Sequence, residues 1–283
     1  MKNKIFLYLK SFIEKKIPIL SRLYRNIRDN RKIYQEPKLI NLGFKFNGNS
    51  EMESGKFEPA ETQTVINLMN QVDSVINVGA NIGYYCCLAA HFDKNVVAFE
   101  PIAQNLKYLL RNIKANKWER KVEVYPMAMS NEIDVLNMFG SGTGASLVKG
   151  WAGVSSAYKS LVPLSTLDNI ISNRFLNDRL LIIIDVEGSE LNTLKGASCL
   201  FNRETKPIWM VEISYDDHQP KSDTINPNLI ETFKIFLDKG YVAKTIELEP
   251  KPVTLDQILE IIDSKDLILS SHNFLFYDPK LQI

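Results

Sequence analysis

The chain has 283 residues, of which 45% are hydrophobic and 24% are charged. This composition is typical of a globular protein and excludes a disordered or fibrous chain. The three cysteines include the adjacent pair Cys86 and Cys87 and form neither a disulfide framework nor a CxxC metal pair. We therefore expect a reducing compartment, the cytoplasm. No two of the three histidines have the spacing of zinc ligands, and no metal is expected.

The formal net charge of +1 hides a basic N-terminal segment. Residues 1–32 contain ten lysines and arginines against two acids, a net charge of +8, which leaves −7 for the remainder. Apolar residues recur there at helical spacing, which predicts a basic amphipathic helical arm over residues 1–35 and a single domain over residues 36–283. Such an arm suits the inner face of an anionic membrane, or a position packed against its own domain or a second copy of the chain. Lys10 and Glu14 interrupt its apolar run, which excludes a signal peptide and a transmembrane helix.

Beyond the arm, strand patterns and helix patterns alternate. Residues 39–59 indicate short strands around glycine turns, and a helix is expected near residues 60–70. The expected strands that follow are 74–78, 95–100, 121–126, 180–185, 207–213, 241–246 and 273–278, and the expected helices include 82–91, 102–116 and 227–239. Residues 127–168 contain the glycine-rich loop "FGSGTGASLVKGW", which is expected to lie over a site. Strands joined by helices predict an α/β fold, a doubly wound three-layer αβα sandwich with a mostly parallel seven-stranded sheet and an antiparallel last strand.

In such a sheet, ligands bind beyond the carboxyl ends of the strands, where strand order reverses. Acids follow several of the expected strands: Glu100, Asp185, Glu187 and Glu212. The turn "GANIG" has Asn81 at the position where a dinucleotide fingerprint has its second glycine, so a ligand without a pyrophosphate fits better, and a nicotinamide-dependent oxidoreductase is not favoured. Glu100 stands where a carboxylate accepts hydrogen bonds from a ribose diol. Together the two features favour S-adenosylmethionine; the alternative is a plain strand-to-helix turn beside an exposed acid.

The motifs "NVGANIGYY", "VVAFEP", "AMS", "STLDNI", "IIIDVEGSELNTLKGA" and "PIWMVEI" occur in this order from about residue 57 to the C-terminus. This series resembles the FkbM family of S-adenosylmethionine-dependent methyltransferases. The resemblance implies a class I methyltransferase (Rossmann-like) fold, S-adenosylmethionine as cofactor, and methylation of a hydroxyl group, often on a sugar or a polyketide. Two positions depart from the family pattern: Asn77 replaces an aspartate, and Ile183 replaces a lysine.

Combining the strand-end acids with the resemblance gives a set of candidate site residues. The expected cofactor-binding residues are Asn77, Gly79, Asn81, Gly83, Glu100, Ser130 and Asp185. The expected catalytic residues are Asp185, Glu187, Glu212 and His218, since a general base is needed to remove the proton of a hydroxyl acceptor. The acceptor is expected to enter under the loop at residues 139–151, where Trp151 offers a flat face to a sugar or simply anchors the loop.

The function expected from these residues is S-adenosylmethionine-dependent O-methylation of a hydroxyl, most plausibly of a sugar in a glycan or glycolipid. Nucleic acid is not expected as a partner because the basic charge lies in the arm rather than around the predicted crevice. The alternative is a catalytically silent methyltransferase fold that serves as a binding or scaffold protein, for which Asn77 and Ile183 are the distinguishing features.

Overall fold

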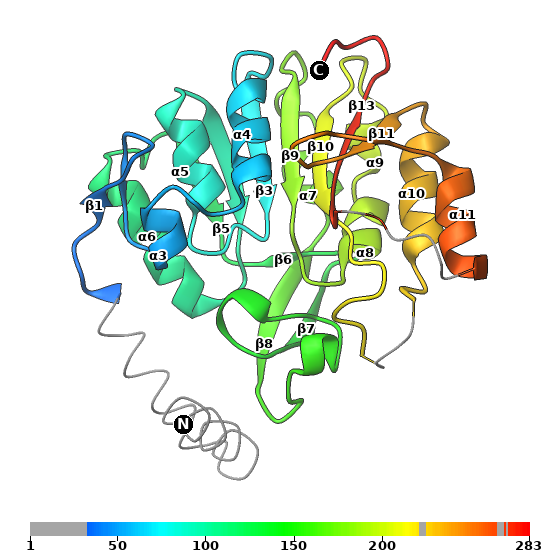
Figure 1. Cartoon of the computed structure of the whole chain (residues 1–283). Coiled ribbons are helices and arrows are strands. Elements are labelled where there is room, and N and C mark those ends of the chain that lie inside the picture. Colours follow the sequence, from blue (N-terminus) through cyan, green and yellow to red (C-terminus); the bar gives the residue numbers. More distant parts are fainter. Residues whose placement is uncertain (1–32, 221–224, 265–268, 270) are drawn as a thin grey trace, which may run out of the picture.

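The computed structural model describes all residues except 1–32, 221–224, 265–268 and 270. Most of the expected N-terminal arm, residues 1–32, therefore lies outside the described residues. The rest of the chain forms a large central sheet flanked by helices, with a smaller sheet beyond one end of its strands (Figure 1).

The central sheet has eight strands in the order β12-β11-β13-β10-β9-β3-β4-β5. Their bounds are β3 Ser74–Val78, β4 Asn95–Phe99, β5 Val122–Tyr125, β9 Leu180–Ile184, β10 Ile208–Glu212, β11 Val242–Thr245, β12 Pro252–Val253 and β13 Asn273–Tyr277. The five strands from β10 to β5 are parallel, and β13 is antiparallel to both β10 and β11. All seven strands expected from the sequence are present, and the two-residue β12 adds an eighth at the edge. The α/β fold with an antiparallel last strand is confirmed.

Helices cover both faces of this sheet. The bounds of the helices are α4 Pro59–Leu68, α5 Tyr84–His91, α6 Ala103–Ala115, α7 Leu167–Ile171, α8 Glu190–Lys195, α9 Ser198–Phe201, α10 Leu229–Leu237 and α11 Leu255–Ser264. One apolar core lies between the sheet and α4, α5 and α6, and the other lies between the sheet and α7 to α11. Alternation along β3 assigns Val75 to the first core and Ile76 and Val78 to the second, as expected for a strand buried on both faces.

A second, three-stranded sheet flanks the glycine-rich loop that the sequence predicts. Its order is β6-β8-β7, with bounds β6 Ala128–Met129, β7 Asp134–Phe139 and β8 Lys159–Ser165. The sequence analysis names no strand within residues 127–168, because the outer side chains of this sheet, Val135 and Leu161 among them, are exposed and break the usual alternation. Single-turn 3-10 helices at Gly142–Gly144 and Trp151–Gly153 interrupt the connection between β7 and β8.

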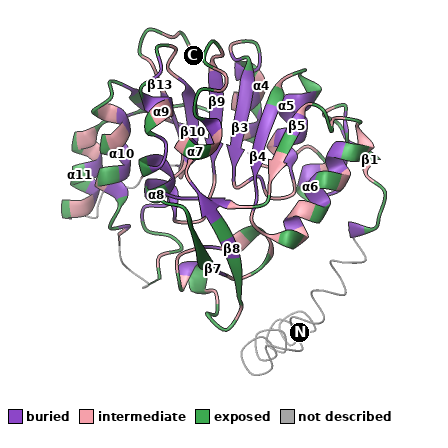
Figure 2. Ribbon diagram, turned by 180° about the vertical axis from the view of Figure 1, so that it is seen from behind, coloured by how far each residue is buried: buried purple, intermediate pink, exposed green. Residues whose placement is uncertain are grey.

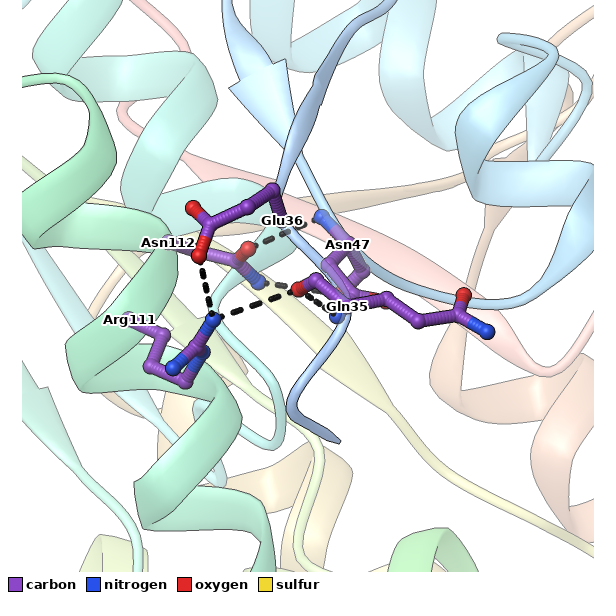
Figure 3. A network of polar contacts seen from close by, with 5 residues as sticks. All are labelled: Gln35, Glu36, Asn47, Arg111 and Asn112. Carbon is purple, nitrogen blue, oxygen red and sulfur yellow. Dashed lines mark hydrogen bonds and ion pairs between the residues drawn. The ribbon is translucent and has the colours of Figure 1, made fainter. Parts of the chain in front are cut away.

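Asparagine side chains attach the first described segment to α6. This segment carries β1 (Lys38–Leu39), β2 (Lys45–Phe46) and α3 (Ser50–Glu53). Asn112 accepts the backbone N–H of Asn47 at 2.8 Å and donates to its carbonyl oxygen at 3.2 Å, while Arg111 reaches Glu36 at 3.3 Å (Figure 3). Asn112 also donates to the carbonyl oxygen of Ile82 at 3.0 Å. One helix residue thus ties the N-terminal segment to the turn that follows β3.

No helix within the described part of the chain is long and apolar enough to span a membrane.

The turn after β3 is closed by contact with the end of β9. Gly79 has φ +82°, and a Cβ added to it would lie 1.7 Å from the carbonyl oxygen of Asp185. The backbone N–H of Asp185 in turn donates to the carbonyl oxygen of Val78 at 3.0 Å. Position 79 therefore excludes every residue with a side chain, because both its backbone conformation and its space require glycine.

Gly79→Ala is expected to destabilise the protein by about 3 kcal/mol or more, since strain at positive φ adds to a clash with backbone that cannot move aside. Urea unfolding measures the effect. Gly142→Ala is the matched control: Gly142 also has a positive φ, +68°, but an added Cβ meets nothing within 4 Å. Its cost is expected to be about 1 kcal/mol. Equal unfolding midpoints for the two variants would contradict the close approach at residue 79.

Candidate active site

A cleft of about 540 Å³, partly open to solvent, lies at the carboxyl ends of β3, β4 and β9. Chain order reverses here, because β4 and β5 extend the sheet on one side of β3 and β9 and β10 extend it on the other. Figure 2 shows the carboxyl ends of β3 and β4 pointing toward the smaller sheet. The connection that follows β7 closes the cleft from that side, with Gly142, Thr143, Ala145 and Leu147 among the lining residues.

Asn81 shapes the glycine turn at the floor of the cleft. It has φ +51°, a left-handed conformation that asparagine tolerates better than most residues. Its backbone N–H donates to Glu100 Oε2 at 2.8 Å. Its side-chain oxygen Oδ1 is buried and has no hydrogen-bond partner among the described residues. Buried polar atoms in proteins are normally hydrogen-bonded, and a ligand bound in the cleft could supply the missing donor to Asn81 Oδ1.

Glu100 directly follows β4 and lines the cleft, with only 3% of the residue exposed. Besides the bond from Asn81, it accepts the backbone N–H of Ile102 at 2.7 Å and a longer bond from Asn105 Nδ2 at 3.3 Å. Burial raises the pKa of Glu100 to about 7, although these hydrogen bonds act in the opposite direction. The carboxylate is thus fixed in place at the position predicted for a ribose-binding acid.

Asp185 and Glu212 form a half-buried carboxyl pair at the ends of the adjacent strands β9 and β10. Asp185 lines the cleft, and Glu212 lies beside it and shares a hydrogen bond with it. Burial, followed by the charge of Glu212, raises the pKa of Asp185 well above its usual range. Burial likewise raises the pKa of Glu212 to about 7. Two carboxylates this close share a proton near neutral pH, so the pair can both donate and accept one.

Two further acids lie near this pair, the half-buried Glu58 and the buried Glu190, and the sequence predictions did not include them. Glu58 precedes α4 with φ +41° and accepts the Tyr85 hydroxyl at 2.6 Å; burial raises its pKa to about 7, and the nearby Asp185 adds to the increase. Glu190, the first residue of α8, accepts the backbone N–H of Gly188 at 2.8 Å, and burial raises its pKa to about 7 as well. The Pro59 that starts α4 marked a helix boundary, but nothing local indicated that Glu58 lies near Asp185.

Glu187 is held by the loop that covers the cleft. Its side-chain Oε2 accepts the indole N–H of Trp151 at 2.7 Å. Trp151 itself is only 4% exposed. The prediction that Trp151 offers a flat face to a sugar was therefore wrong, because its ring packs on Gly188 and is covered. The alternative, an anchoring tryptophan, agrees with the structure.

The other predicted residues divide into two groups. Gly79, Asn81, Glu100, Asp185 and Glu187 all line the cleft. Glu212 lies beside Asp185 but outside the lining, and the second group lies elsewhere: Asn77, Gly83, Ser130 and His218.

Each residue of the second group has a visible local role. Asn77 donates to Cys86 Sγ at 3.4 Å beneath the turn, and Gly83 faces Leu109 of α6, which an added Cβ would approach to 2.3 Å. Ser130 is buried and donates to the side chain of Asn131 at 3.1 Å. His218 is exposed, and its ring centre lies 6.0 Å from that of Trp151. The neighbouring Met127, Ala128 and Met129 line the cleft where Ser130 was expected.

The mostly parallel sheet with an antiparallel last strand and a cleft at its strand ends is the arrangement expected of a class I methyltransferase. The family model described as "Methyltransferase FkbM domain" matches residues 77–243, more than half of the chain. The chain belongs to this family, as the resemblance implied. It is a methyltransferase, and S-adenosylmethionine is its cofactor.

Several solved structures are similar to the chain. The O-methyltransferase from Bacillus cereus in complex with SAH shares 10% identity and a TM-score of 0.42, with 80% of this chain and 84% of that chain covered. A putative O-methyltransferase from Klebsiella pneumoniae shares 12% identity and a TM-score of 0.41, with 95% and 94% covered. P. horikoshii TYW2 in complex with MeSAdo shares 24% identity and a TM-score of 0.26 over 31% of this chain, which spans 36% of that protein. No curated protein matches the sequence.

The residues of the cleft fit this cofactor. Glu100 offers a fixed carboxylate for the ribose hydroxyls, Asn81 offers an unpartnered Oδ1, and Met127 and Met129 offer polarisable apolar surface for an adenine ring. Beyond these, a negative charge shared by Asp185 and Glu212 beside the cleft would suit a positively charged sulfonium. Within the described part of the chain, no three His, Cys, Asp or Glu side chains are arranged to hold a metal ion.

The buried acids make the stability of the protein depend on pH. A carboxyl whose pKa rises from 4.5 to about 7 on folding binds its proton more tightly in the folded state. The free energy of unfolding is therefore expected to fall as the pH rises through this interval. Glu190→Gln keeps an acceptor for Gly188 but does not titrate, so its unfolding free energy should fall less between about pH 5 and about pH 8 than that of the wild type. Denaturant unfolding at both pH values measures this, with the exposed Glu132→Gln as control. Identical slopes in wild type and Glu190→Gln would show that Glu190 ionises normally.

Proposed function

We propose that the chain is an S-adenosylmethionine-dependent O-methyltransferase whose acceptor is a hydroxyl of a sugar in a glycan or glycolipid. The observation that carries the proposal is the half-buried, hydrogen-bonded Asp185–Glu212 carboxyl pair, which lies beside a cleft suited to the cofactor. A sugar hydroxyl is a weak nucleophile, and its methylation requires a group that takes up the hydroxyl proton.

The pair is arranged for this proton transfer. Asp185 faces the cleft, and Glu212 lies behind it on the next strand. As the acceptor oxygen attacks, Asp185 takes the hydroxyl proton and passes its own proton to Glu212. The bound cofactor supplies the electrophilic methyl group, and the remaining residues hold the two reactants in line and exclude water. Because Glu212 must be ionised to receive the proton, the rate should rise with pH through about 7.

The charge of the site supports a sugar over a phosphate-rich acceptor. Glu58, Asp185, Glu190 and Glu212 lie close enough together for the charge of one carboxylate to raise the pKa of another. Carboxylates accept hydrogen bonds from several hydroxyls at once, whereas they repel the phosphates of a nucleic acid. We therefore propose a carbohydrate acceptor and no nucleic-acid partner.

We further propose that residues 36–283 act as one methyltransferase domain in the cytoplasm. The basic residues of 1–32 suit contact with the inner face of a membrane, where a lipid-linked glycan would be found, or with a second copy of the chain. Titration of anionic and neutral lipid vesicles with the full chain distinguishes these two roles.

Replacement of Glu100 tests the cofactor site. Glu100→Ala removes the carboxylate proposed to hold the ribose and is expected to weaken binding of S-adenosylmethionine and S-adenosylhomocysteine by about a hundredfold, the loss of two charge-assisted hydrogen bonds. Isothermal titration calorimetry measures both affinities. Glu123→Ala, at an acid on β5 outside the cleft, is the control. Unchanged affinities in Glu100→Ala would show that Glu100 does not bind the ribose.

Replacement of the carboxyl pair tests the proton transfer. Asp185→Asn and Glu212→Gln each interrupt the relay, and each should slow methyl transfer by about a hundredfold or more. Transfer of a labelled methyl group to a panel of oligosaccharides measures the rate, and the exposed Asp216→Asn serves as control. A wild-type rate of methyl transfer in Asp185→Asn would show that Asp185 takes no part in the proton transfer.

The same assay tests the alternative hypothesis, a catalytically silent binding protein. Asn77 does not line the cleft, so its neutral side chain takes no charge away from the cofactor site. Ile183 is buried on β9 and also stays outside the cleft lining. Neither departure from the family pattern thus alters the cleft directly. Cofactor binding without methyl transfer to any hydroxyl acceptor would favour the silent protein.

A further inference from the structure

The connection between β7 and β8 makes a buried contact with the turn after β9, and the methyl-transfer mechanism does not use this contact. Residues 140–154, named here the cleft loop, leave β7 and contribute one wall of the cleft through Gly142, Thr143, Ala145 and Leu147. The cleft loop meets the turn after β9 at Glu187 and Gly188, two residues of the "DVEGSE" motif.

Both Glu187 and Gly188 contact the side chain of Trp151. The indole N–H donates to Glu187 Oε2 at 2.7 Å. The indole ring lies so close to Gly188 that an added Cβ would come within 2.6 Å of it. Any residue other than glycine at this position would push the ring away. Both turn residues have left-handed backbones, with φ +52° at Glu187 and +95° at Gly188, which aim the carboxylate and the bare Cα at the tryptophan.

Further hydrogen bonds hold the cleft loop on both sides of this contact. Ser146, only 1% exposed, donates its hydroxyl to the carbonyl oxygen of Glu187 at 2.5 Å. Beyond the tryptophan, the N–H of Ala152 donates to the carbonyl oxygen of His218 at 2.7 Å. At the far side of the cleft, Asn105 donates to the carbonyl oxygen of Gly142 at 3.2 Å and also to Glu100. The wall of the cleft is therefore held at both of its ends.

We propose that Trp151 is a positioning residue: its bond to Glu187, with the ring seated on Gly188, latches the cleft loop over the cofactor and sets the affinity for S-adenosylmethionine. The inference rests on the proposed use of this cleft for the cofactor. It also gives the Glu187 carboxylate a different task from proton transfer, because Oε2 is occupied by the indole N–H.

The test compares variants that break the bond with one that keeps it. Trp151→Phe keeps a ring but loses the donor, Glu187→Ala loses the acceptor, and Glu187→Gln keeps an oxygen acceptor without the charge. Trp118→Phe is the matched control, since Trp118 packs against Phe44 and His91 in the first core, away from the cleft. Calorimetry gives the dissociation constant for S-adenosylhomocysteine. Tryptic cleavage after the exposed Lys149, which lies inside the cleft loop, reports its opening independently of any acceptor.

Trp151→Phe and Glu187→Ala are each expected to speed cleavage after Lys149 and to raise the dissociation constant by about tenfold, the loss of one charge-assisted hydrogen bond. The double variant should be no worse than either single one, because both remove the same bond. Glu187→Gln should stay within about threefold of the wild type, and Trp118→Phe should match it. Should Trp151→Phe lower the unfolding temperature markedly, the comparison of Glu187→Ala with Glu187→Gln decides.

Two results would overturn the latch: wild-type cleavage and affinity in both bond-breaking variants, or equal losses in Glu187→Ala and Glu187→Gln. The second result would assign the effect to the charge of Glu187 instead of its bond. A wild-type protein that binds neither S-adenosylmethionine nor S-adenosylhomocysteine would instead refute the cofactor site itself, together with the inference built on it.

Discussion

The contact between the turn after β3 and the end of β9 is the constraint on which the site depends. The two strands are parallel neighbours, and the carbonyl oxygen of Asp185 occupies the space where a side chain of residue 79 would lie. This close approach fixes the direction in which each chain leaves the sheet. The glycine turn then runs toward Glu100, and the β9 turn runs toward Trp151. One backbone contact therefore places Glu100, Asp185 and Glu187, to which the proposals assign the ribose, the proton transfer and the loop contact, around one cleft.

A second feature is the concentration of acids that burial keeps partly protonated near neutral pH. Each buried carboxylate costs free energy, and folded proteins retain such groups where their chemistry is needed. Asp185 and Glu212 lie at the centre, with Glu58 and Glu190 on either side. Tyr85 supports Glu58 with a 2.6 Å hydrogen bond, so α4 and α5 contribute to the site as well as β9 and β10. The free energy that these carboxylates cost the folded protein agrees with a site that transfers protons.

The sequence predicted the main sheet well because its strands have a strong local signal. Leu180 to Ile184 form an unbroken apolar run between polar residues, and buried parallel strands are made of such runs. The glycine turn and Glu100 were found for a similar reason, since their spacing follows from the length of one strand-helix-strand unit. The small sheet gave no comparable signal. Pro163 stands within β8, and it fits there because β6 pairs with β8 only at Leu164 and Ser165.

Side-chain direction was the part of the site that local pattern did not determine. Asn77 and Val78 are neighbours, yet only Val78 lines the cleft, because alternate residues of a strand face opposite sides. Glu58 reaches the acid pair through tertiary packing across more than a hundred residues of sequence. Trp151 points inward because Gly188 leaves room for its ring, a match between two distant segments. Such contacts arise only when the fold is complete.

A crystal structure of the protein with S-adenosylhomocysteine bound tests the central claim most directly. We predict that the ribose hydroxyls contact Glu100, that the adenine lies beside Met127 to Met129, and that the sulfur faces Asp185 beneath the cleft loop. A ligand found in any other part of the molecule, or one at this cleft whose ribose makes no contact with Glu100, would contradict the site described for this methyltransferase.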